Sequence, residues 1–104
     1  MKTRYYFQQY DDPNYIEPYQ FSEGAYKHLV RNIKTWCNCG VEVNRTMTSV
    51  SYRYGNYRIR HYYNTIDGTS RESWLISVID IDGIYTPVYR TYKETQEDLN
   101  NDRF

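Results

Sequence analysis

The sequence has few of the features that define several classes of protein. Its only two cysteines, Cys37 and Cys39, are too few for a disulfide framework and too close together for an ordinary bridge, so we expect reduced thiols. No run of about 20 apolar residues is present, which excludes a transmembrane helix, and the N-terminal residues lack the apolar stretch of a secretory signal. We therefore expect a cytoplasmic protein, folded as a single domain over residues 1–104.

Aliphatic side chains are also scarce. Leu, Ile, Val and Phe make up only 20 of the 104 residues, a level typical of disorder when the net charge is high. The net charge here is zero, because 13 Lys and Arg balance 13 Asp and Glu. The sequence contains 14 Tyr and 2 Trp instead, whose rings bury large areas and keep a polar tip. This composition predicts a folded chain whose core is unusually rich in tyrosine.

Residues 22–40 have the pattern of an amphipathic helix. Ser22 can cap the first turn, and Phe21 stands at the spacing of a hydrophobic staple from Tyr26. Gly40 is expected to end the helix in a left-handed conformation. The apolar residues that recur at steps of three and four are Tyr26, Leu29, Val30, Ile33, Trp36 and Cys37.

Beyond residue 40 the apolar period becomes two, which predicts strands. The residue pairs that predict two-residue hairpin turns are Gly55-Asn56, Asp67-Gly68 and Asp82-Gly83. The result is a four-stranded antiparallel meander within residues 41–92, with a β-bulge expected near residues 47–49. Because Pro87 cannot donate to a sheet ladder, the last strand is expected at an edge of the sheet, unless the missing donor of Pro87 already points outward.

Three such turns fix the register of the meander and separate its two faces. The face expected to cover the helix carries Val50, Tyr52, Tyr54, Tyr57, Ile59, His61, Tyr63, Trp74, Ile76, Val78, Tyr85, Pro87 and Tyr89. The opposite face is basic at one end and apolar at the other. We therefore predict an α+β fold in which one N-terminal helix packs on the four-stranded meander. An aromatic arm over residues 1–21 precedes the helix, and a short acidic tail over residues 93–104 ends the chain.

The basic face holds the candidate site. The register places Arg53 directly opposite Arg58, within a segment, residues 27–71, that carries eight basic and two acidic residues. Like charges across a strand pair are destabilising unless an anion lies between them. A phosphate, a carboxylate of a partner, or acidic residues of the chain's own tail could supply that anion. The residues predicted to bind a partner are Arg53, Arg58, Arg60, Tyr62, Arg71 and Arg90. The alternative is a solvated face whose arginines splay apart, in a fold whose charged segments neutralise one another.

No metal site, cofactor or catalytic centre is predicted. The cysteine pair, together with His28 and His61, lacks the spacing of zinc ligands. His28 falls on the polar side of the helix and His61 on the core side of the sheet, and no nucleophile has a suitably spaced acid partner. We therefore expect a protein that is not an enzyme and needs no cofactor.

Two classes of function remain. Abundant tyrosine with arginine favours a protein-binding module, because both residues are enriched in protein interfaces. The arginine-rich sheet face, with Tyr62 or Tyr92 available for stacking, favours a small RNA- or DNA-binding module instead. A protein partner is expected, with a nucleoprotein complex and direct nucleic-acid contact as the open alternatives, and no membrane partner.

The chain as a whole has one resemblance. A short, tyrosine-rich α+β chain with a helix from Ser22 to Gly40 and a meander from Val41 to Tyr92 resembles, in style and without a shared motif, small inhibitors of host defence. Such inhibitors are encoded by phages and mobile elements, and anti-CRISPR proteins are among them. The resemblance implies stoichiometric inhibition of a nucleic-acid-processing defence complex in the host cytoplasm. It assigns no role to any particular residue.

Overall fold

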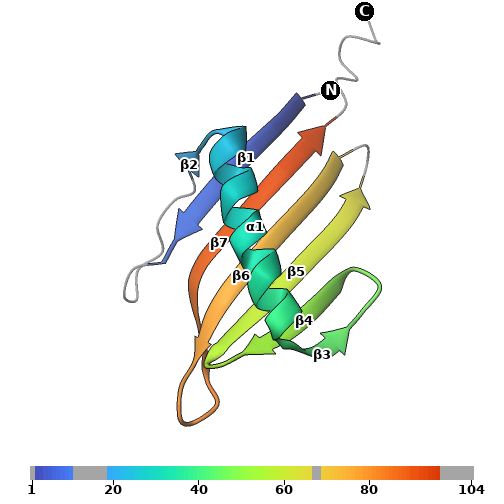
Figure 1. Ribbon diagram of the computed structural model, residues 1–104. Coiled ribbons are helices and arrows are strands. Elements are labelled where there is room, and N and C mark those ends of the chain that lie inside the picture. The colour runs from blue at the N-terminus through green and yellow to red at the C-terminus, as the bar shows by residue number, and fades with distance from the viewer. Residues whose placement is uncertain (1, 11–18, 67–68, 97–104) are drawn as a thin grey trace, which may run out of the picture.

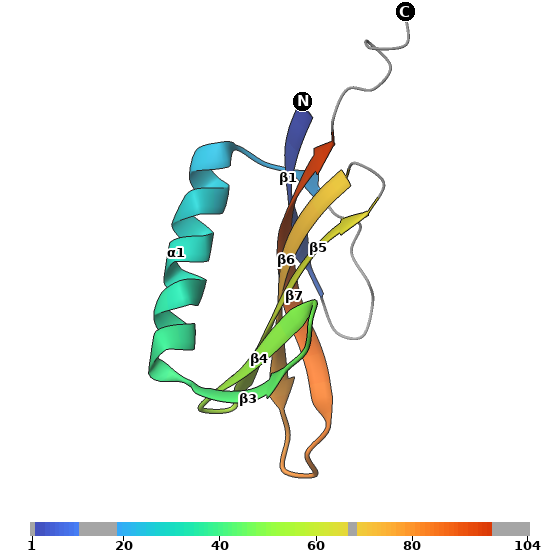
Figure 2. The ribbon, with the colours of Figure 1, turned by 90° about the vertical axis from the view of Figure 1, so that its right-hand side faces the viewer.

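The computed structural model describes residues 2–10, 19–66 and 69–96. These residues form one antiparallel sheet of seven strands, with one helix lying diagonally across one face (Figure 1 and Figure 2). The elements are β1 (Lys2–Gln9), β2 (Tyr19–Gln20), α1 (Glu23–Cys39), β3 (Val41–Arg45), β4 (Ser49–Tyr54), β5 (Tyr57–Ile66), β6 (Thr69–Ile79) and β7 (Tyr85–Gln96). The strand order across the sheet is β2-β1-β7-β6-β5-β4-β3. The predicted α+β class is confirmed.

The sheet is larger than the predicted four-stranded meander. The expected first strand, from residue 41 to residue 54, is instead two antiparallel strands, β3 and β4, while β5, β6 and β7 are the other three strands of the meander. The strands β1 and β2 extend the sheet beyond β7. The expected aromatic arm forms β1, which pairs with β7 from Lys2↔Gln96 to Gln9↔Tyr89, while β2 pairs with β1. The first residues of the expected tail, 93–96, continue β7. The rest of the tail, 97–104, and residues 11–18 of the arm lie outside the described residues.

Of the two alternatives for Pro87, the edge position of the last strand is wrong. β7 lies between β1 and β6 in the sheet. Pairing with β1 ends at Tyr89, after which the N–H of Tyr10 donates to the carbonyl oxygen of Val88 at 3.0 Å. Pro87 therefore lies beyond the end of β1, where its missing N–H removes no hydrogen bond to that strand.

The helix begins as predicted but ends differently. Ser22 caps it, since its Oγ accepts a hydrogen bond from the N–H of Ala25 at 3.1 Å, and the staple rings of Phe21 and Tyr26 have centroids 6.4 Å apart. Gly40 is extended, with φ −91° and ψ 174°, so the expected left-handed conformation is wrong. A Cβ at this position would lie 2.8 Å from the carbonyl oxygen of Arg53. Glycine is required here because the chain leaving α1 passes close to the backbone of β4.

The core lies between α1 and the sheet. Its fully buried members come from both layers, as the sequence predicts: Tyr26, Val30, Ile33 and Cys37 from α1, and Ile59, Trp74 and Ile76 from β5 and β6. The strand β1 adds Tyr5, whose ring centroid lies 5.0 Å from that of Tyr26. Tyrosine therefore contributes to the core through its ring, as its abundance indicates.

The strand register agrees with the prediction except near the third turn. The pairings of β4 with β5 and of β5 with β6 are those that two-residue loops produce, and Gly55 has the positive φ, +58°, that such a loop needs. The Asp67-Gly68 turn itself lies outside the described residues. Between β6 and β7 the predicted register holds from Thr69↔Gln96 to Ile76↔Tyr89, and then it shifts.

The shift arises because the third hairpin has a three-residue loop. The N–H of Gly83 donates to the carbonyl oxygen of Asp80, and the N–H of Asp80 donates to that of Ile84, both at 3.0 Å, while Gly83 has a φ of +81°. An extra residue in β7, at the irregularity opposite Ile76 and Ser77, then restores the register. As a consequence, Tyr85 and Pro87 lie on the face opposite α1. The prediction of both on the helix side is wrong.

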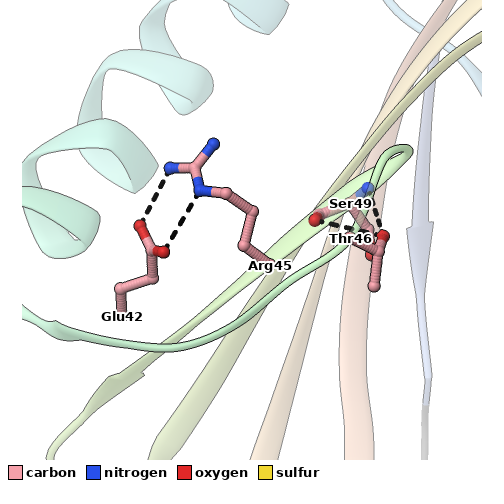
Figure 3. Close-up of polar contacts among 4 residues, drawn as sticks. All are labelled: Glu42, Arg45, Thr46 and Ser49. Atoms are coloured by element: carbon pink, nitrogen blue, oxygen red, sulfur yellow. Dashed lines mark hydrogen bonds and ion pairs between the residues drawn. The ribbon is translucent and has the colours of Figure 1, made fainter.

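The β-bulge expected near residues 47–49 is also misplaced. Residues 47 and 48 belong to the connection between β3 and β4, Ser49 begins β4, and the register shift lies at Val43 within β3. Figure 3 shows the hydroxyl of Thr46 accepting the N–H of Ser49 at 2.9 Å, and Arg45 donating to the Glu42 carboxylate at 3.1 and 2.9 Å. A bulge and an ion pair on an edge strand hinder pairing with other chains.

Candidate functional site

The candidate site lies on the face of the sheet opposite α1, which no described element covers (Figure 2). We call this surface the arginine face. The basic residues that the strand register places on it are Lys2, Arg4, Arg53, Arg58, Arg60, Arg71 and Arg90. Within the described ranges, the strands of this face carry one carboxylate, that of Glu94. The surface is therefore strongly positive on a chain whose formal net charge is zero.

All six residues predicted to bind a partner lie on the arginine face. Arg53 on β4 stands directly opposite Arg58 on β5, as predicted. Arg60 and Tyr62 follow along β5, whereas Arg71 lies on β6 and Arg90 on β7. The site therefore spans four neighbouring strands, or roughly 14 Å at the usual spacing of about 4.8 Å between strands.

Two of the site arginines donate hydrogen bonds to groups of the sheet and its turn. Arg60 donates from Nε to the hydroxyl of Ser51 at 3.0 Å and from Nη1 to the hydroxyl of Tyr62 at 3.1 Å. Arg53, which is exposed, donates from Nε to the carbonyl oxygen of Gly55 at 3.1 Å. These contacts fix the directions of the guanidinium groups before any partner arrives.

Arg58 is held by an aromatic ring that the sequence analysis placed on the other face. Its guanidinium carbon lies 3.6 Å from the ring centroid of Tyr85, a close cation–π contact that crosses β6. The serine beneath this contact, Ser77, is only 2% exposed although no helix covers it. The sequence contained a signal for the position of Tyr85. Asp80 stands three residues before Gly83, a spacing typical of a type I turn. Such a turn favours a three-residue hairpin loop over the two-residue Asp82-Gly83 loop, and the longer loop moves Tyr85 to the other face.

One end of the arginine face is neutralised by the chain itself. Arg71 is ion-paired with Glu94, and its guanidinium carbon lies 5.9 Å from the ring centroid of Tyr92. Tyr92 in turn stacks on Tyr6 of β1, with ring centroids 4.7 Å apart. Arg71 is therefore neutralised by an acidic residue of the expected C-terminal tail, which is one of the three anion sources considered from the sequence. Among the described residues, that tail neutralises none of Arg53, Arg58, Arg60 and Arg90.

The polar groups on the helix side form a separate cluster. The ring of His61 stacks on Trp74 with centroids 3.7 Å apart, and its Nε2 is buried 3.7 Å from the Glu72 carboxylate. The hydroxyl of Tyr26 donates to the same carboxylate at 3.3 Å. Contact with His61 is the main cause that lowers the pKa of Glu72, and burial raises the pKa of Tyr26. The cluster joins α1 to the sheet, and its groups are engaged with one another.

The helix side also has two hollows. An open groove of about 620 Å³ runs beside α1, where its lining includes Lys27, Arg31, Lys34 and Lys93. A smaller apolar cavity of about 240 Å³ is lined by Trp36, Tyr54, Tyr57, Ile59, Ile76 and Tyr89. Neither hollow contains any of the six predicted site residues.

The two cysteines differ in environment. Cys37 is buried, as the helix pattern predicts, and Cys39 is exposed, and both are free thiols. Burial raises the pKa of Cys37 to about 11. Within the described ranges, no three His, Cys, Asp or Glu side chains lie close enough together to hold a metal ion.

Comparison with known proteins gave no match to a protein-family model, a curated protein or a solved structure. The helix of the described region is neither long enough nor apolar enough to cross a membrane.

Proposed function

We propose that this protein is a non-catalytic binding protein that docks its arginine face onto an acidic surface of a partner protein. One observation carries the proposal. Arg53, Arg58, Arg60 and Arg90 share an uncovered sheet face, and no described carboxylate is paired with any of them. Folding has gathered like charges that repel one another, and an anionic partner would offset that cost.

The contacts within the face favour a protein partner. Arg58 is held on Tyr85 and Arg60 on Ser51 and Tyr62, so little side-chain entropy is lost when these residues bind. Arginine and tyrosine are also the residues that carry much of the energy of protein interfaces. The formal net charge of zero limits attraction to bulk polyanions and leaves recognition to the local field of this face.

The resemblance in style supplies a biological setting for this binding. Within the proposal, the protein acts in the cytoplasm, that of the host cell if a phage encodes it. There it inhibits a nucleic-acid-processing defence complex, of the kind that anti-CRISPR proteins block, by occupying one of its surfaces. Because a non-catalytic protein blocks only the surface that it occupies, inhibition would require one copy of the protein for each target complex.

A second candidate is a small RNA- or DNA-binding module, which one observation favours. The stacked pair Tyr6 and Tyr92 lies beside Arg71 on the open face. Exposed aromatic rings beside cations are used to stack bases of single strands. A phosphate backbone would then occupy the arginines at the centre of the face.

The test reverses charge on the arginine face and compares it with the same reversal elsewhere. Arg58→Glu/Arg60→Glu is expected to weaken the complex with a partner captured from host lysate by at least about thirtyfold. The control, Arg31→Glu/Lys34→Glu, makes the same charge change at exposed positions of α1 and should leave affinity within about threefold. Urea unfolding of both variants checks that each remains folded.

Salt and nuclease separate the two candidate functions. A protein contact anchored by tyrosine survives nuclease digestion and weakens moderately with salt, whereas a nucleic-acid contact is lost on digestion and weakens steeply. Capture by Arg58→Glu/Arg60→Glu equal to that by the unmodified protein would refute both, because both depend on the arginine face.

A further inference from the structure

We infer that Arg90 is the residue at which the arginine face grips a carboxylate of its partner, an inference that rests on the proposed function. Arg90 lies on β7 directly between Gln8 of β1 and Leu75 of β6. Because β7 has strands on both sides, Arg90 lies in the interior of the face, two strands away from Arg60 on β5. Central positions carry most of the binding energy in protein interfaces, because the surrounding contacts exclude water from them.

The hydrogen bonding of Arg90 separates it from the other predicted arginines. Its Nε is buried and has no hydrogen-bond partner. In contrast, the Nε atoms of Arg53, Arg60 and Arg71 each donate a hydrogen bond within the chain. Arg58 is occupied in a different way, by its cation–π contact with Tyr85.

A buried donor without an acceptor is unfavourable, and more so when the donor is charged. The free protein therefore holds the Arg90 side chain in a state that any acceptor would improve. When an anion approaches, the guanidinium can turn toward it, so that Nε and one Nη donate together. Binding then gives the Nε–H of Arg90 an acceptor, in addition to forming the new hydrogen bond from Nη. This difference between the free and bound states makes Arg90 a stronger contributor to affinity than the arginines that are already satisfied.

The geometry of guanidinium indicates the class of ligand group. Nε–H and a neighbouring Nη–H form a planar fork that matches the two oxygens of a carboxylate, a match that a lysine ammonium does not provide. The proposed partner is an acidic protein surface, so the group is an Asp or Glu side chain. The one carboxylate that the described strands place on the face, that of Glu94, is paired with Arg71 and leaves Arg90 to the partner.

The experiment measures binding of a fluorescent polyglutamate peptide by anisotropy, with an oligothymidylate of equal formal charge as the second probe. Arg90→Met keeps an unbranched apolar stem and removes the donors. We expect it to weaken polyglutamate binding by about tenfold or more, because it removes a charge-assisted pair. Arg90→Lys keeps the charge and loses the planar pair of donors. It should therefore recover only a minor part of the polyglutamate affinity that Arg90→Met loses. The matched control, Arg31→Met, removes an exposed arginine of α1, outside the arginine face, and should change binding by less than about threefold.

Two further readouts distinguish an anchor from a merely structural residue. Arg90→Met should unfold at a urea concentration no lower than that of the unmodified protein, since it removes an unsatisfied buried donor. In spectra of the side-chain Nε–H groups, the signal that Arg90→Lys abolishes should shift when polyglutamate is added. A lower unfolding midpoint, or a signal that stays in place, would overturn the inference.

The remaining outcomes separate this inference from the proposed function. Polyglutamate binding that Arg58→Glu/Arg60→Glu abolishes and Arg90→Met leaves intact would refute Arg90 as the anchor and support the arginine face. Equal losses of polyglutamate affinity in Arg90→Met and Arg31→Met would show that binding depends only on the overall charge, and would also refute Arg90 as the anchor. If only oligothymidylate binds, and binding depends on Arg90, the ligand group is a phosphate and the carboxylate assignment is wrong. If no variant changes any binding, the proposed function fails as well.

Discussion

Replacing Trp74 by alanine tests the packing of α1 on the sheet. The indole is 3% exposed, and it belongs to the core that joins α1 to β5 and β6. Its ring lies parallel to that of His61, with an angle of 2° between the planes. Burying about 200 Å² of aromatic surface stabilises a fold by roughly 5 kcal/mol at about 25 cal/mol per Å². Partial collapse of the cavity makes the expected loss about 3 to 5 kcal/mol, a large part of the stability of a small domain.

The assay is urea unfolding followed by far-ultraviolet circular dichroism, with Trp74→Phe as the control. Phenylalanine keeps a ring to stack on His61 and removes the indole N–H, which is buried without a hydrogen bond. We expect this variant to lose less than about 2 kcal/mol, because removal of the unsatisfied donor offsets part of the lost packing. A loss below about 1 kcal/mol for Trp74→Ala would refute the assigned core. Equal losses for the two variants would show that ring packing is not the source of the stability.

The helix could be predicted from the sequence because its signals are local. The capping hydroxyl of Ser22, the staple between Phe21 and Tyr26, and the apolar spacing all lie within one segment of the chain. The conformation of Gly40 could not be predicted in this way. It depends on the backbone of Arg53, which the sheet brings close only after folding.

The pairing of β1 with β7 could not be predicted from local patterns. Lys2 pairs with Gln96, at the other end of the chain, and the helix and five strands lie between them. Alternation was present in β1, where Tyr5 and Phe7 face the helix side, but alternation does not specify which strand will be the partner. The meander could be predicted because each of its strands pairs with the next through a short turn.

The arginine face could be predicted only where the predicted strand register was correct. Arg53 and Arg58 flank a two-residue turn, so their pairing followed from the position of Gly55 alone. The place of Tyr85 depended on the third turn, where one extra loop residue moved its side chain to the opposite face. A register error of one residue therefore placed the ring that contacts Arg58 on the wrong face of the sheet.

Three further predictions concern single positions on the helix side and in the core. Gly40→Ala should cost about 1 to 3 kcal/mol in urea unfolding, because its Cβ would lie 2.8 Å from a backbone oxygen of β4, whereas Gly24→Ala, with no atom within 4 Å, should cost nothing. Iodoacetamide should label Cys39 in the native protein and Cys37 only after unfolding, as peptide mass spectrometry would show, because burial raises the pKa of Cys37 to about 11. The last prediction is that stability falls on acidification partly through Glu72. The pKa of this carboxyl is lower in the folded protein than in the unfolded chain, with contact to His61 as the main cause. The unfolded chain therefore takes up its proton first as the pH falls, so the stabilisation is complete above the unfolded pKa and is lost as the pH passes through the folded one. Glu72→Gln should be less stable than the unmodified protein near neutral pH and should lose less stability between about pH 6 and pH 3. Parallel curves of unfolding free energy against pH for the two proteins would show that the carboxylate does not stabilise the join between α1 and the sheet.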